Sequence, residues 1–182
     1  MNEVTISKFM SLVLRHEPKQ LGVELDKEGW TDFAEFGAKM AAKFNVSEVQ
    51  LLDLIKNNPK QRFVLRDGKI RANQGHSVEV DLALPPSQPP TVLYHGTTYS
   101  VLERINQEGL IKGQRNHVHL STDLATAEKV AVRRSGPWVI FKIDSNKMFR
   151  SRIQFFMSEN GVWLTDHVSP EYLLVMKEWG KI

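Results

Sequence analysis

The sequence predicts a mixed α+β protein made of two lobes, and three observations lead to this class. The first part holds three amphipathic segments followed by a short hairpin, and the second part alternates short apolar runs with helical patterns. Between them lies the stretch ALPPSQPPT, residues 83–91, which carries four prolines and has no helical or strand period. We therefore expect lobes at 1–82 and 92–182, joined by an extended Pro-rich linker at 83–91.

The first lobe is expected to begin with a helix over residues 4–15, because its apolar side chains recur at helical spacing. Pro18 prevents this helix from continuing, so it ends on Arg15 and His16. Cations at a helix C-terminus complement the helix dipole, which is one explanation for this pair. The other is that the helix delivers both side chains to a negatively charged partner.

Two more helices and a hairpin are predicted to follow. Either Thr31 or Asp32 can cap the second helix, whose apolar face consists of Phe33, Phe36, Met40 and Phe44. The third helix opens on Ser47-x-x-Gln50, a capping-box pattern, and its buried side consists of Leu51, Leu52 and Ile55. Asp67-Gly68 between two short alternating runs indicates a hairpin. Helix, helix, helix, hairpin is the layout of a winged helix-turn-helix module, which commonly binds nucleic acid.

The second lobe reads as an α+β unit of short elements. A helix is expected over Tyr99–Glu108, ended by Gly109, and a second one over 122–134 that Gly136-Pro137 breaks. The segments that read as strands are TVLYHGT, VHLS, WVIFKID, GVWLT and EYLLVM.

Composition excludes several classes of protein. The 182 residues contain no Cys, which excludes a disulfide framework and a thiolate zinc site. There is no 18-residue apolar run and no secretory pattern, so we expect a cytoplasmic protein without membrane contact. Net charge is only +3, but residues 104–152 hold ten Lys and Arg against four Asp and Glu. A local positive field of this kind suits a phosphate-bearing partner.

Common enzyme motifs are absent from the sequence, including the Gly-rich loops that bind nucleotides and the Gly-x-Ser-x-Gly elbow. Arg and His instead recur beside turns and at the ends of expected elements. His95-Gly96-Thr97 ends a strand, and the glycine would let a ligand approach the backbone closely. His117 and His119 are expected on one strand face, but no nearby Cys or carboxylate completes a metal set, so we expect no metal.

Three other arginines have plain explanations when each is taken alone. Arg71 lies on the second strand of the expected hairpin, opposite in sense to Ile70 and Ala72, which predicts a solvated side chain. Arg133 and Arg134 end a predicted helix, where they complement its dipole.

Several long motifs occur in order across nearly the whole chain: SKFMSLVLRHEPKQLGVELDKEGW, IRANQGHS, LYHGT, VHLS and ENGVWLT. In these motifs the sequence resembles the RNA 2′-phosphotransferase (tRNA 2′-phosphotransferase) family. The resemblance implies a winged-helix RNA-binding lobe and an ADP-ribosyltransferase-like lobe that binds NAD. It also implies action on RNA carrying an internal 2′-phosphate, with NAD⁺ as the phosphate acceptor. We expect the protein to be a monomer.

The resemblance implies site residues as well. The catalytic set of the family falls on Arg15, His16, Arg71 and Arg133, although Arg134 is adjacent to the last and equally basic. Arg15 and His16 are then expected to point across the lobe interface toward Arg71 and Arg133. The residues implied for NAD binding are His95, Gly96, Thr97, His119, Ser121 and Val162. Val162 stands where many wider relatives carry a glutamate, and a 2′-phosphate, being already anionic, needs no such base.

The implied reaction has two steps. The 2′-phosphate attacks the ribose C1″ as nicotinamide leaves, and the ribose 2″-hydroxyl then attacks the phosphate. The products are 2′-OH RNA and ADP-ribose 1″,2″-cyclic phosphate. Two alternatives stay open at this point: transfer of ADP-ribose onto a nucleic-acid terminal phosphate, and a winged-helix nucleic-acid binder without enzymatic activity.

Overall fold

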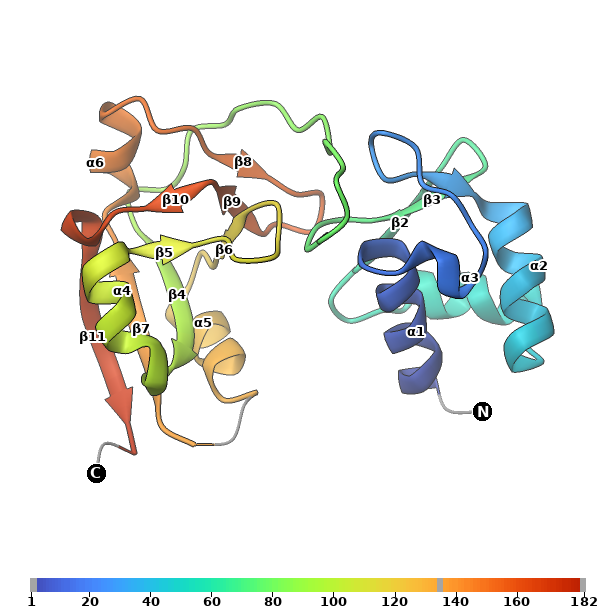
Figure 1. Ribbon diagram of the computed structural model, residues 1–182, viewed down its shortest axis with the longest axis horizontal. Helices are drawn as coiled ribbons and strands as arrows, with labels where there is room; N and C mark the ends of the chain where they lie inside the picture. The colour runs from blue at the N-terminus through green and yellow to red at the C-terminus, as the bar shows by residue number, and fades with distance from the viewer. Residues whose placement is uncertain (1–2, 134–135, 181–182) are drawn as a thin grey trace. The chain divides into compact units, whose positions relative to one another are not determined.

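The structure, a computed structural model, describes residues 3–133 and 136–180, which fall into two compact units (Figure 1). The first unit ends at Ala83 and the second begins at Leu84. Both contain helices and short antiparallel strands, so the predicted α+β class is confirmed.

The first unit holds three helices, one 3₁₀ turn and three strands. In chain order these are α1 (Glu3–Arg15), η1 (Pro18–Gln20), β1 (Thr31–Asp32), α2 (Phe33–Phe44), α3 (Glu48–Lys56), β2 (Phe63–Arg66) and β3 (Lys69–Ala72).

Local chemistry sets the boundaries of these helices. α1 ends at Arg15, and Pro18 opens the following 3₁₀ turn. Asp32 caps α2, because its side chain accepts a hydrogen bond from the backbone N–H of Glu35. The capping box predicted for α3 is confirmed, since Ser47 and Gln50 bond to each other's backbone N–H.

The three strands form one antiparallel sheet in the order β1-β3-β2. β2 and β3 make the predicted hairpin, in register from Phe63 opposite Ala72 to Arg66 opposite Lys69. Asp67 and Gly68 at its turn have φ values of 50° and 73°, the left-handed conformation that a tight two-residue hairpin requires.

The core of this unit is formed where the three helices pack on the sheet, and it includes Met10, Phe36, Met40, Leu51 and Ile70. The prediction that Leu52 is buried is wrong, because its side chain is 37% exposed. α3 is only nine residues long, and its buried residues are Leu51 and Ile55, four positions apart on one narrow face that leaves Leu52 outside.

The second unit interleaves helices and short strands. In chain order these are β4 (Leu93–Thr98), η2 (Tyr99–Val101), α4 (Leu102–Glu108), β5 (Leu110–Ile111), β6 (Val118–Leu120), α5 (Leu124–Ala131), β7 (Trp138–Ile143), α6 (Ser145–Arg150), β8 (Phe156–Met157), β9 (Trp163–Thr165), β10 (His167–Val168), η3 (Pro170–Tyr172) and β11 (Leu173–Trp179).

The strands of the second unit pair in three small antiparallel sheets, β11-β7-β4, β6-β9-β8 and β10-β5. In the central strand β7, Val139, Ile140 and Phe141 are fully covered. A reciprocal pair of backbone hydrogen bonds between Tyr94 and Ser121 ties β4 to the end of β6. These two strand ends therefore lie side by side.

Two helices of this unit differ from their predicted extents. The segment predicted as one helix from Tyr99 starts with the 3₁₀ turn η2 before α4, and it ends at Gly109 as expected. α5 stops at Ala131, short of the predicted end at 134, and its cap is Val132. Arg133 therefore lies beyond the helix, and Arg134 lies outside the described residues.

The Pro-rich stretch is bound to the second unit over most of its length. Ser87 donates its backbone N–H to the carbonyl of Phe155, and Pro86 pairs with Phe156. The carbonyl of Pro90 accepts from the Ser145 hydroxyl at 2.6 Å. Prolines cannot donate these backbone bonds, so the stretch is held through its carbonyls and through Ser87.

None of the helices that the structure describes combines the length and apolar content that crossing a bilayer requires.

Candidate functional site

Arg15 and His16, at the end of α1, are anchored by residues 74–78 that follow β3. The ring Nδ1 of His16 lies 2.8 Å from the hydroxyl of Ser77. The backbone carbonyl of Arg15 accepts hydrogen bonds from the backbone N–H groups of Ser77 and Val78. The side-chain Nη2 of Arg15 donates to Gln74 Oε1 at 3.3 Å. One of the carbonyls that a helix end leaves without an intrahelical partner is thus satisfied by this segment.

Arg71 is buried, with 4% of its surface exposed, so the prediction of a solvated strand arginine is wrong. Its guanidinium lies over the ring of Trp30, 4.4 Å from the centroid, and Nη1 donates to the carbonyls of Glu28 and Leu82, both at 3.3 Å. The turn that carries Glu28 and Trp30 covers the face of the hairpin that strand alternation alone assigns to solvent. Stacking and two acceptors together hold the guanidinium in one orientation.

A buried histidine connects these cations. His76 is 1% exposed, and its pKa is lowered to about 3, first by burial and then by the positive charges of Arg15, Arg71 and His16. All three cations therefore act on one ring within the first unit. His76 belongs to the motif IRANQGHS, and no pattern in the sequence predicts a role for it. Its position between Gln74 and Ser77 indicates a role only when the contacts of these two residues with Arg15 and His16 are known.

The structure places Arg133 in the second unit, exposed and just after α5. Its backbone N–H donates to the carbonyl of Val130 at 3.4 Å. The competing residue Arg134 is not among the residues described. The assignment of the fourth catalytic position to Arg133 therefore stays a prediction.

In the second unit, His95 on β4 lies beside His119 on β6. The Nδ1 atom of His95 is 2.9 Å from the His119 carbonyl. Burial lowers the pKa of His95, the hydrogen bond to this carbonyl opposes the shift, and Arg115 adds to it. A carbonyl only accepts, so the neutral ring donates from Nδ1 and carries its lone pair on Nε2.

Arg115 determines the tautomer of His119. Its Nη1 lies 3.2 Å from Nδ1 of His119, and a guanidinium only donates, so this nitrogen accepts. His119 in its neutral form then carries a hydrogen on Nε2. His117 precedes β6, and its ring meets the ring of Phe156 edge-on at 5.7 Å. His95, His119 and Arg115 thus present one lone pair, one N–H donor and one cation.

Gly96 makes room for the neighbouring helix α5, and not for a ligand as the sequence had suggested. A Cβ at this position would lie 2.0 Å from the carbonyl oxygen of Ala127 on α5. The space beside its Cα is therefore taken by a helix backbone, not left for a ligand. Thr97, the next residue on β4, pairs with Val139 of β7. Gly96 lets α5 pack tightly on β4 and so places the end of this helix.

Val162 lies in the turn before β9. Its N–H donates to the Ser158 hydroxyl at 3.1 Å, and its carbonyl accepts from both the N–H and the hydroxyl of Ser158. The backbone at this position is thus committed to a tight turn, and its apolar side chain offers no acid or base.

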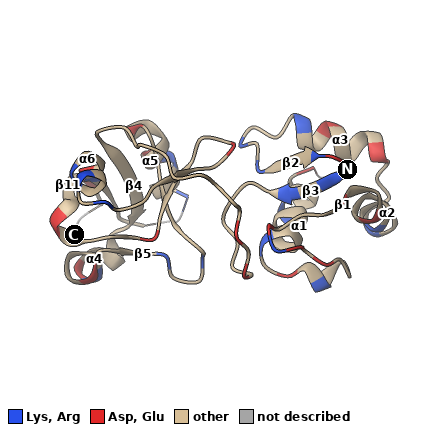
Figure 2. Cartoon of the chain, turned by 90° about the horizontal axis from the view of Figure 1, so that it is seen from above, with Lys and Arg blue, Asp and Glu red and all other residues tan. Residues whose placement is uncertain are grey.

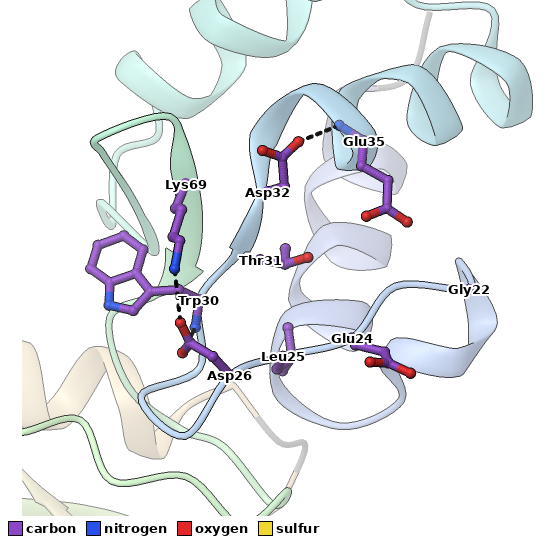
Figure 3. A pocket seen from close by; sticks show the side chains of 9 residues that line it. All are labelled: Gly22, Glu24, Leu25, Asp26, Trp30, Thr31, Asp32, Glu35 and Lys69. Atoms are coloured by element: carbon purple, nitrogen blue, oxygen red, sulfur yellow. Dashed lines mark hydrogen bonds and ion pairs between the residues drawn. The ribbon is translucent and has the colours of Figure 1, made fainter.

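A separate pocket of about 490 Å³ lies in the first unit (Figure 3). The residues that line it are Gly22, Glu24, Leu25, Asp26, Trp30, Thr31, Asp32, Glu35 and Lys69. Four carboxylates face one amine, and Asp26 bonds to Lys69 at 3.2 Å while Asp32 is used as the cap of α2. This negative pocket does not suit a phosphate.

Charged residues of both signs are spread over both units (Figure 2), so overall charge does not locate the site. Within the described ranges, no group of three or more His, Asp or Glu side chains is arranged to hold a metal ion.

The chain is similar to curated proteins over almost its whole length. It is 50% identical over 171 residues to a probable RNA 2′-phosphotransferase of Rhizobium leguminosarum bv. trifolii, covering 94% of this chain and 93% of that protein. Proteins of the same printed name match at 48% over 177 residues in Trichormus variabilis, covering 96% and 97%, and at 47% over 172 residues in Flavobacterium johnsoniae, covering 93% and 94%.

The family model described as RNA 2′-phosphotransferase, Tpt1/KptA family, matches residues 1–167. That span contains Arg15 and His16 at the end of α1, the hairpin with Arg71, and the strands β4 and β6 with His95 and His119. With this match and relatives at about half identity, the chain belongs to the RNA 2′-phosphotransferase, Tpt1/KptA family.

Proposed function

We propose that this protein removes an internal 2′-phosphate from RNA by transferring it to NAD⁺. Family membership supports the removal of the 2′-phosphate. The observation that carries the assignment to residues is that Arg15 and His16 bond to Gln74 and Ser77, on either side of the buried His76, while Arg71 bonds to the Glu28 carbonyl in the turn that borders the same ring. Three cationic or titratable donors of this kind suit an anionic group such as a phosphate dianion.

The first unit is proposed to be a winged-helix lobe that binds the RNA. Its three helices followed by the β2–β3 hairpin support this assignment. Arg71 is already held by Trp30 and by two carbonyls, so little rotamer freedom is lost when it binds an anion. Arg15 donates to the side chain of Gln74.

The second unit is proposed to be an ADP-ribosyltransferase-like lobe that binds NAD⁺. The chemistry of its donors fits this ligand: Arg115 and the Nε2–H of His119 suit pyrophosphate oxygens, and the lone pair on His95 Nε2 suits a ribose hydroxyl. Ser121, which pairs with Tyr94, and Thr97, further along β4, add hydroxyls to the same two strands. Val162 adds apolar surface and no carboxylate, in keeping with a nucleophile that is already anionic.

In the first proposed step, a 2′-phosphate oxygen forms a bond to the ribose C1″ while the bond from C1″ to nicotinamide breaks. The electron pair of that bond stays on the nicotinamide nitrogen, which leaves as a neutral molecule. The protein supplies position here, because neither the nucleophile nor the leaving group exchanges a proton.

In the second proposed step, the ribose 2″-oxygen bonds to phosphorus while the bond from phosphorus to the RNA 2′-oxygen breaks. The 2″-hydroxyl loses a proton and the departing 2′-oxygen gains one, which yields 2′-OH RNA and ADP-ribose 1″,2″-cyclic phosphate. Charge grows on the phosphoryl oxygens, where Arg15, Arg71 and Arg133 are proposed to act. His16 is proposed to donate to one of these oxygens or to handle the proton.

One assay tests the proposal. A short RNA with a single internal 2′-phosphate is incubated with the protein, with and without NAD⁺. We expect the phosphate to be lost only when NAD⁺ is present, with release of nicotinamide. A stable adduct of RNA, phosphate and ADP-ribose would favour the terminal-phosphate transferase instead. Binding without any turnover would contradict both enzymatic functions and leave the nucleic-acid binder.

The fourth arginine has its own test. We expect Arg133→Ala to slow the reaction more than Arg134→Ala under the same conditions. Equal rates would show that the assignment to Arg133 is wrong.

A further inference from the structure

His76 is a buried polar side chain without a hydrogen bond. Only 1% of its surface is exposed, and neither ring nitrogen has a partner among the residues that the structure describes. Buried polar atoms are almost always paired, because an unpaired one loses its water without compensation. A residue that violates this rule in both of its polar atoms calls for an explanation.

Packing does not supply that explanation. The ring fills a real space, since a Cβ built on Gly29 would lie 3.2 Å from its Nε2 and 3.7 Å from Val80. A phenylalanine ring of similar shape would fill this space with no unsatisfied nitrogen. The imidazole thus lowers stability relative to an apolar ring, which is the pattern expected where a residue is retained for function.

The surroundings of His76 indicate which function this is. Its neighbour Ser77 bonds to His16, and Gln74, two residues before it, bonds to Arg15. Arg15, Arg71 and His16 also act on the ring electrostatically. His76 therefore stands among the groups proposed to hold the 2′-phosphate, close enough for its polar atoms to matter to them.

A neutral imidazole is well suited to that place. A lysine or a protonated histidine would repel the two guanidinium groups, and a carboxylate would bind them and compete with the phosphate. A neutral ring does neither, yet its lone pair can accept a hydrogen bond from a guanidinium N–H.

We propose that His76 is a positioning residue of the phosphate site, whose uncharged ring separates the Arg15 and Arg71 side chains and accepts a hydrogen bond from one of them when the phosphate is bound. This inference rests on the proposed function, because it assigns the 2′-phosphate to these arginines. His76 acts through them and does not contact the reacting atoms.

The test separates the stability of the protein from its activity. His76→Phe keeps an aromatic ring, slightly larger than the imidazole, and removes the unpaired nitrogens, so its Tm should equal or exceed that of the wild type. We expect kcat on 2′-phosphorylated RNA to fall roughly ten- to hundredfold, the range found when outer groups that orient ligands are removed. The KM for NAD⁺ should not change. His76→Gln, which keeps an acceptor, should recover part of the rate.

A control variant in the same unit is Asn58→Leu. Asn58 is buried and donates to the Ser7 hydroxyl at 3.2 Å, so its loss should lower Tm and leave kcat unchanged. A drop in Tm and kcat together for His76→Phe, as for an ordinary core residue, would overturn the proposal. So would wild-type kcat in that variant.

Binding measurements distinguish this failure from failure of the proposed function. The affinity of the wild type for an RNA with an internal 2′-phosphate is compared with that for the same RNA with a 2′-hydroxyl, without NAD⁺. A preference that is strong in the wild type and reduced in His76→Phe supports the inference. An equal preference in both proteins overturns it and leaves the proposed function standing. No preference in the wild type overturns both.

Discussion

His16 and Ser77 lie 61 residues apart in the chain, yet a hydrogen bond of 2.8 Å joins the ring Nδ1 to the hydroxyl Oγ. A hydroxyl both donates and accepts, so this bond persists whether the ring is neutral or protonated. It orients the opposite nitrogen, Nε2, which is the atom we propose to meet the phosphate. The segment that carries Ser77 also binds the carbonyl of Arg15, so it holds both residues at the end of α1.

Removing this hydroxyl is expected to slow the reaction without unfolding the protein. In Ser77→Ala the ring of His16 gains rotational freedom, and the loss of one hydrogen bond of about 1–1.5 kcal/mol corresponds to about a tenfold lower kcat. Ser77 is exposed, so Tm should change little. Steady-state rates with 2′-phosphorylated RNA give the comparison, and Ser77→Thr, which keeps a hydroxyl, serves as the control. Wild-type kcat in Ser77→Ala would show that the bond does not orient His16 for the reaction.

Arg71 and Arg66 offer a matched pair, because both lie over the ring of Trp30. Arg71→Lys removes the flat fork that stacks and donates to two carbonyls, and we expect kcat to fall by roughly a hundredfold, about 3 kcal/mol. Arg66 is exposed, 5.7 Å from the ring centroid, so Arg66→Lys should remain within about twofold of the wild type. Equal losses in both variants would assign the effect to Trp30 rather than to a bound phosphate.

The sequence predicted the parts of this protein that short-range chemistry determines. The capping box of Ser47 and Gln50 and the turn at Asp67-Gly68 each depend on a few adjacent residues, and both are confirmed. Arg71 shows the limit of such reasoning. Strand alternation predicts on which face of the strand the Arg71 side chain lies. That face is buried because the turn at Trp30, distant in the sequence, covers it.

The same limit explains what was missed in the candidate site. The small size of Gly96 by itself predicts room for a ligand, whereas its neighbour in the fold is the carbonyl of Ala127, which belongs to another element. The sequence predicts no role for His76, because its surroundings depend on contacts made by Gln74 and Ser77 with the end of α1. Charge counts, motifs and periods contain no such long-range information. The resemblance to a family pointed to Arg15, His16 and Arg71 without giving a physical reason for their positions.

The contact between Gly96 and Ala127 predicts a stability effect. A methyl group at position 96 cannot coexist with a carbonyl oxygen 2.0 Å away, so in Gly96→Ala the helix α5 must shift. We expect the free energy of unfolding to fall by about 1–3 kcal/mol, measured by urea unfolding. The control is Gly37→Ala, because Gly37 is within α2 and nothing lies within 4 Å of its added Cβ. That variant should be as stable as the wild type or more stable by up to about 1 kcal/mol. The contact would be unimportant if both variants unfolded at the wild-type midpoint.

Acid is expected to destabilise the protein through His76. Its pKa of about 3 in the folded protein lies below the ordinary value of 6.5, so below pH 6.5 the unfolded chain binds a proton that the folded one does not. Above pH 6.5 the His76 ring is neutral in both states and does not affect the free energy of unfolding. As the pH drops from 6.5 toward 3, this free energy falls by about 1.4 kcal/mol per pH unit. Burial lowers the pKa of His95 as well, so below pH 6.5 this residue also lowers the free energy of unfolding.

The carboxyls of Asp26 and Asp123 also have lowered pKa values, but their contribution is lost only below their ordinary value of 3.8. Between pH 6 and 4.5 the histidines therefore dominate. Urea unfolding of the wild type and His76→Phe over this range isolates the one group, since the other terms are common to both proteins. We expect the variant to lose stability more slowly, by a difference of about 1.4 kcal/mol per pH unit. Parallel pH profiles would mean that His76 is protonated in the folded protein, and a protonated ring would repel the guanidinium groups that it is proposed to separate.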